Sequence, residues 1–125
     1  LCGHSLGGGI AQVGALDIAP LFDAVELVTF GAPRAVHQIT PILGNITHTR
    51  VVNNCDIVSR VPSRASGYTH WGDCVYFDHD GQRADLEGWA LFLDRVAGRF
   101  DDFGTLGTAG VNDHGMPEYL RLAGV

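Results

Sequence analysis

The stretch GHSLGG, residues 3–8, decides the fold of this chain because it has the pattern G-x-S-x-G between two regular elements. The residues before it, Leu1–Gly3, are typical of the end of a strand. Those after it, Leu6–Leu16, are rich in Gly, Ala, Ile, Val and Leu with few charges, as in a buried helix. The order strand, sharp turn, helix makes Ser5 a candidate nucleophile.

The turn at Ser5 explains the residue types around it. A serine held there adopts a strained backbone conformation, so we expect that side chains in place of Gly3 and Gly7 would clash. The turn presents the hydroxyl at the positive end of a helix, where developing negative charge is favoured. The backbone N–H of Leu6 would supply one oxyanion-hole donor.

Apolar and β-branched runs alternate with helical periodicity along the rest of the chain. The pattern predicts strands over 24–30, 47–52 and 74–77, a turn over 78–81, helices over 84–103 and 116–122, and a Gly/Thr-rich loop over 104–110. This alternation favours a mainly parallel sheet in a three-layer α/β architecture, whose ligands bind beyond the carboxyl ends of strands.

A serine nucleophile needs a histidine base, and the base needs an acid to orient it. Asp56 lies just beyond a predicted strand and precedes apolar residues, so its carboxylate is expected to be partly buried. His114 lies on a late loop, where a hydrolase base is expected. His70 is the alternative base because it follows the Asp56 loop closely, whereas His4 is expected to pack or hydrogen-bond under the turn.

The overall composition argues against several classes of partner. With 125 residues, 46% of them hydrophobic, the chain is expected to be one domain or part of one, and its net charge of −6 argues against nucleic acid. It contains no run of 18 apolar residues, so we expect no transmembrane segment and at most peripheral membrane contact. A disulfide between Cys55 and Cys74 is left open by the sequence.

The sequence blocks together resemble the class 3 lipases, a family of the α/β-hydrolase superfamily. The similarity is carried by GHSLGG (3–8), VTFGAPR (28–34), RVVNNCDIVSRVP (50–62), YTHWGDCVYFD (68–78) and DHGMPEYL (113–120). The resemblance implies an α/β-hydrolase fold with Ser5, Asp56 and His114 as the catalytic triad. It also implies a structural role for His70.

The resemblance carries further expectations about the whole protein. Residues 1–125 correspond to the C-terminal portion of the family's domain, so the fold is expected to be truncated at its N-terminus. The first strands, the lid helix and the second oxyanion donor would lie upstream. The implied reaction is hydrolysis of acylglycerols or other lipid esters, without a metal or organic cofactor. Phospholipid, feruloyl ester or thioester hydrolysis, or a catalytically silent lipid-binding domain, are the alternatives.

Overall fold

A computed structural model describes residues 1–78, 80–84 and 109–124 of the chain. Its strands are β1 (Cys2–His4), β2 (Val25–Phe30), β3 (Val36–His37), β4 (Ile46–Asn53), β5 (Tyr68–Thr69), β6 (Asp73–Phe77) and β7 (Arg83–Ala84). Its helices are α1 (Leu6–Ile18), α3 (Ala109–Asn112) and α4 (Met116–Ala123), with single 3₁₀ turns at Ala19–Leu21, Val58–Arg60 and Arg64–Ser66.

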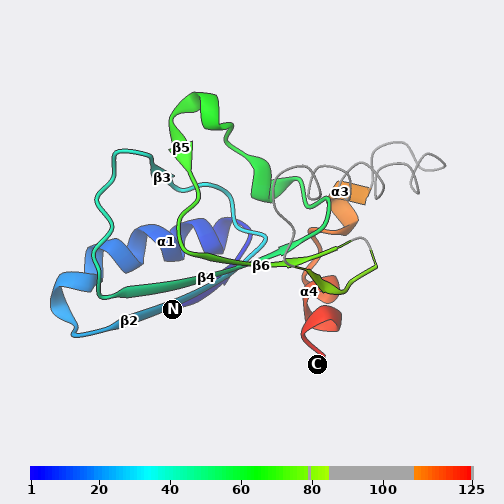
Figure 1. Cartoon of the computed structure of the whole chain (residues 1–125), viewed down its shortest axis with the longest axis horizontal. Coiled ribbons are helices and arrows are strands. Elements are labelled where there is room, and N and C mark those ends of the chain that lie inside the picture. Colours follow the sequence, from blue (N-terminus) through cyan, green and yellow to red (C-terminus); the bar gives the residue numbers. More distant parts are fainter. Residues whose placement is uncertain (79, 85–108, 125) are drawn as a thin grey trace.

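The main sheet has the strand order β1-β2-β4-β6-β7 within the described residues. The pairs β1–β2, β2–β4 and β4–β6 are parallel, and β7 adds to β6 in the antiparallel direction. Figure 1 shows α1 lying along the sheet and α3 and α4 near the ends of β4 and β6. These features confirm the predicted α/β class and the mainly parallel sheet.

Small residues allow α1 to pack closely on the sheet. Ala11, Ala15 and Ala19 are buried and form a core cluster with Val25 and Leu27 of β2. Removing this apolar surface from water stabilises the strand–turn–helix unit that carries the GHSLGG stretch. The core therefore lies between the C-terminal half of α1 and the first residues of β2.

Some local predictions differ from the structure. The predicted loop over 104–110 is wrong at 109–110, because α3 begins at Ala109; residues 104–108 lie outside the described part of the chain. The helix predicted over 84–103 also lies outside it, apart from Ala84, which belongs to β7. Strands β3 and β5 form a separate antiparallel pair of two residues each, too short to leave a periodic pattern.

The structure bears on two points raised by the sequence, a Cys55–Cys74 disulfide and a membrane-spanning segment. In the described part of the chain no disulfide joins Cys55 to Cys74: the Cys55 side chain is buried, whereas Cys74 is exposed. No helix among the described residues is both long enough and apolar enough to span a bilayer.

Candidate active site

Three residues of the site follow the carboxyl ends of three neighbouring parallel strands. Ser5 follows β1, Gly31 follows β2, and Asp56 lies three residues after the end of β4. Because these strands are adjacent and point the same way, the residues after them meet at one edge of the sheet.

The turn at Ser5 has the strain expected of it. Ser5 has φ 56° and ψ −129°, a backbone conformation that residues other than glycine rarely adopt, and it is the N-cap of α1. Its N–H donates to the carbonyl of Phe30 at the end of β2 (3.0 Å), and its own carbonyl accepts from the N–H of Gly8 (3.0 Å). The start of α1 and the neighbouring strand therefore hold the strained conformation.

The glycines around Ser5 confirm one steric prediction and overturn the other. A Cβ on Gly3 would meet the backbone of Gly7, so Gly3 is required as expected. The predicted clash at Gly7 is wrong, because a Cβ there has open space around it. The crowded position is Gly8, whose Cβ would lie 2.6 Å from the Cβ of Ala32 and 2.9 Å from the Gly3 carbonyl oxygen.

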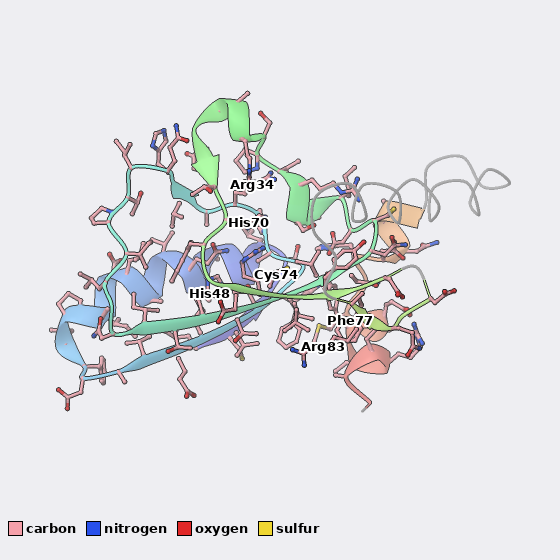
Figure 2. The ribbon with its side chains drawn as sticks, in the orientation of Figure 1. Arg34, His48, His70, Cys74, Phe77 and Arg83 are labelled. Atoms are coloured by element: carbon pink, nitrogen blue, oxygen red, sulfur yellow. The ribbon has the colours of Figure 1, made fainter. Side chains whose placement is uncertain are left out.

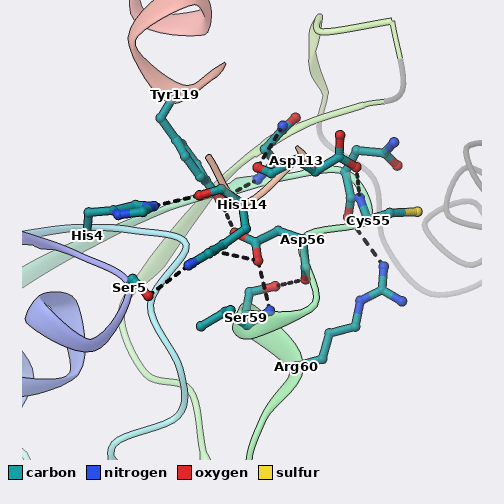
Figure 3. Close-up of polar contacts among 12 residues, drawn as sticks. His4, Ser5, Cys55, Asp56, Ser59, Arg60, Asp113, His114 and Tyr119 are labelled. Carbon is teal, nitrogen blue, oxygen red and sulfur yellow. Dashed lines mark hydrogen bonds and ion pairs between the residues drawn. The ribbon is translucent and has the colours of Figure 1, made fainter. Parts of the chain in front are cut away.

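His114 lies between Ser5 and Asp56, although 109 residues separate it from Ser5 (Figure 3). Its Nε2 is 2.7 Å from Ser5 Oγ, and its Nδ1 is 3.0 and 3.1 Å from the two carboxylate oxygens of Asp56. A carboxylate only accepts hydrogen bonds, so Nδ1–H donates to Asp56 and Nε2 is left to accept from the serine hydroxyl. This is the tautomer that a general base requires.

Asp56 is fully buried, and several donors hold its carboxylate. Besides His114, the N–H of Val58 donates to Oδ1 (2.8 Å) and the hydroxyl of Tyr119 donates to Oδ2 (2.6 Å). Burial and the neighbouring Asp56 raise the pKa of Tyr119 well above its ordinary value, so the phenol remains a donor. Because each donor has a fixed direction, the carboxylate faces His114 in a single orientation.

Tyr119 was not identified from the sequence. It lies five residues after His114 on α4 and is only 2% exposed, and its oxygen also accepts from the N–H of Asn53 at 3.1 Å. No motif marks such a tyrosine. A sequence signal for it would be the position of a large aromatic residue on a short helix that begins directly after the candidate base.

Gly31 is the second residue that the sequence did not single out. It has φ +52°, and a Cβ there would meet Asp56 Oδ2 and would lie 2.9 Å from the Tyr119 hydroxyl oxygen and 3.1 Å from His114 Nδ1. The absence of a side chain therefore leaves the space in which Asp56 and His114 meet. The rule that sites lie beyond carboxyl ends of strands, applied to β2, would have pointed to this glycine.

The loop that carries His114 is tied to the end of β4. Asp113 accepts from the side-chain N–H of Asn53 through its carbonyl (3.1 Å) and from the N–H of Cys55 through Oδ2 (3.0 Å). On the other side, His4 contacts the His114 main chain. These bonds bring a histidine from the end of the chain to strands formed much earlier in the sequence.

The alternative base, His70, has a different partner. Its Nε2 is 2.6 Å from the carbonyl oxygen of Ser59, to which it must donate, and burial lowers its pKa to about 4. The buried His48 is similar: its Nε2 lies 3.0 Å from the hydroxyl of Thr29, and burial lowers its pKa to about 4 as well (Figure 2). Within the described residues, His114 is the histidine that contacts the Ser5 hydroxyl.

The arrangement has the parts required for nucleophilic attack by a serine. The Ser5 hydroxyl faces Nε2 of His114, and the His114 side chain is 19% exposed, so the imidazole ring is partly accessible to solvent. Leu6 is the first residue of α1, where a backbone N–H has no partner within the helix. Among the described residues, no group of three or more His, Cys, Asp or Glu side chains is placed to hold a metal ion.

Comparison with known proteins gives two similarities. The family model described as lipase (class 3) matches residues 1–66, slightly more than half of the 125 residues. The chain is also similar to the crystal structure of the Lip2 lipase from Yarrowia lipolytica, with a TM-score of 0.48 and 24% sequence identity. That similarity covers 62% of this chain and 31% of the Yarrowia chain, so the matched part is about a third of the length of that lipase.

Proposed function

The chain belongs to the class 3 lipase family, and on this basis we propose that it hydrolyses carboxylic esters of lipids through an acyl-enzyme on Ser5. The observation that carries the proposal is the position of His114, with Nε2 2.7 Å from Ser5 Oγ and Nδ1 3.0 Å from Asp56 Oδ1. Hydrogen-bond contact on both sides of the imidazole is what distinguishes a catalytic base from a histidine that merely packs near a serine.

In the first half of the reaction, Ser5 Oγ attacks the ester carbonyl carbon while its proton passes to Nε2 of His114. Asp56 stabilises the resulting imidazolium through the bond at Nδ1. The carbonyl oxygen becomes negatively charged, and the N–H of Leu6 at the start of α1 is the donor proposed for it. His114 then gives the proton to the leaving alcohol, and the acyl group remains on Ser5.

In the second half, water takes the place of the alcohol. Its proton passes to His114 Nε2 while its oxygen bonds to the acyl carbon, and the proton then moves to Ser5 Oγ as the acid leaves. This cycle requires that the His114 imidazole be correctly oriented in two steps, facing the serine hydroxyl during acylation and water during deacylation.

The surface beside Ser5 supports an apolar substrate. Leu6, Ile10 and Val13 are exposed and follow at four- and three-residue steps on α1, so they lie along one face of the helix that starts at Ser5. An acyl chain in contact with such a face would bury apolar area, which favours lipid esters over small polar ones.

The proposal can be tested on the protein at its full natural length with tributyrin, p-nitrophenyl butyrate and a butyryl thioester. We expect ester turnover that is abolished in the Ser5→Ala variant and lowered at least about 1000-fold in His114→Ala, the order of magnitude for losing a triad member. Faster turnover of the thioester would transfer the proposal to thioesterases. Folded protein that binds triglyceride without any turnover would favour the catalytically silent alternative.

A further inference from the structure

His4 occupies the first x position of the G-x-S-x-G stretch, and its side chain contacts the proposed base. It is the last residue of β1, directly before Ser5, and its Nε2 lies 2.7 Å from the carbonyl oxygen of His114. A carbonyl oxygen can only accept, so the Nε2–H of His4 donates this hydrogen bond. The turn that carries the nucleophile is thereby joined to the loop that carries the base (Figure 3).

The two imidazole rings are also stacked. The ring centroids of His4 and His114 are 4.7 Å apart with an interplanar angle of 25°, and the His4 ring meets Tyr119 edge-on at 5.7 Å. The face of the His114 ring is therefore covered by His4, while its two nitrogens remain engaged with Ser5 and Asp56. The contact with His4 restricts rotation of His114 without using either nitrogen.

The importance of this contact changes during the proposed reaction. Before acylation, the hydrogen bond from Ser5 Oγ to Nε2 helps to orient His114. In the acyl-enzyme, Oγ is bonded to the acyl carbon and carries no proton, so that hydrogen bond is lost. The bonds of Asp113 hold the preceding residue to β4 and do not touch the ring. Among the described residues, the stacked His4 ring and the Asp56 carboxylate still contact the imidazole and orient it for attack by water.

We infer that His4 is a positioning residue that holds His114 in place during deacylation through its hydrogen bond to the His114 carbonyl. This inference rests on the proposed acyl-enzyme mechanism. Removing the bond is expected to slow the second half of the reaction more than the first, because in the first half Ser5 itself still orients the base.

The experiment compares His4→Phe, which keeps an aromatic ring without a donor, with His4→Gln, which keeps an N–H donor without the ring. Stopped-flow hydrolysis of p-nitrophenyl butyrate gives the rates, and quenched samples analysed by mass spectrometry give the steady-state fraction of acyl-Ser5. For His4→Phe we expect deacylation about tenfold slower, the size expected for losing one such bond, with acylation within about threefold of the original. The acyl-Ser5 fraction rises accordingly.

Two further variants make the result specific. His4→Gln is expected to recover most of the deacylation rate, and His37→Phe, at the exposed position of β3, is the matched control with unchanged rates. If His4→Phe slows acylation and deacylation equally, or if His4→Gln deacylates no faster than His4→Phe, the inference about His4 is refuted. The proposed acyl-enzyme mechanism would still stand. Absence of acyl-Ser5 in every variant and in the unaltered protein would overturn the proposed mechanism together with it.

Discussion

Replacing Gly31 with alanine should disable the site while leaving its polar residues unchanged. The added Cβ would meet Asp56 Oδ2 and lie 3.1 Å from His114 Nδ1, so the carboxylate has to move by about an ångström to regain ordinary van der Waals separation. Misplacing a reacting group by that amount costs about 100-fold in rate. The backbone adds a second penalty, because φ +52° costs a residue with a Cβ about 1–2 kcal/mol.

The assay is kcat/KM for p-nitrophenyl butyrate with the full-length protein, together with urea unfolding. We expect Gly31→Ala to lower kcat/KM at least about 100-fold per folded molecule and to reduce the free energy of unfolding by at least about 1 kcal/mol. Gly14→Ala is the matched control: Gly14 lies within α1 with open space around it, so alanine should stabilise the helix by about 0.5–1 kcal/mol at unchanged activity. A folded Gly31→Ala variant with activity within about twofold of the original would refute the reasoning, since that rate difference is far below the expected one.

Two other perturbations have expected outcomes. Tyr119→Phe removes a donor from Asp56 and leaves the buried N–H of Asn53 without its acceptor. We therefore expect the free energy of unfolding to fall by about 1–3 kcal/mol and kcat to fall by up to about tenfold. An unchanged urea unfolding curve would contradict this. His48 and His70 have pKa values lowered from 6.5 to about 4 in the folded state, so the unfolded state takes up protons first as the pH falls. Their contribution to stability is therefore complete above about pH 6.5 and is lost as the pH falls towards 4. Urea midpoints measured between pH 7.5 and about 4.5 should decline, and less steeply in His70→Gln; equal slopes in the two proteins would show that His70 has no such linkage.

The sequence was most informative where hydrophobic patterning is local. The runs over 24–30 and 47–52 have the apolar, β-branched composition of buried parallel strands, and β2 and β4 lie there with boundaries within two residues. The structure also brings Ser5, Asp56 and His114 into hydrogen-bond contact, and their catalytic roles stay a prediction. Such strands can be predicted because both faces of a parallel sheet are buried, so the sequence of each strand is a nearly continuous run of apolar residues.

The remaining features depend on contacts between distant segments. The error at Gly7 arose because a motif gives the spacing of residues but not the neighbours that crowd each position. The loop after β2 places Ala32 against Gly8, whereas the space around Gly7 is open. Likewise, the role of Gly31 follows from Asp56 and Tyr119, which approach it only in the folded chain. Helix α3 at 109–112 is a single turn in a Gly-rich segment, too short for periodicity to predict.

The most direct test of the central proposal is labelling of the full-length protein with a fluorophosphonate, followed by mapping of the modified peptide by mass spectrometry. We expect one label on Ser5, none in Ser5→Ala, and labelling at least about 1000-fold slower in His114→Ala, because the base is required to activate the hydroxyl. Labelling of a different serine, or folded protein whose Ser5 never reacts, would contradict the assignment of Ser5 as the nucleophile.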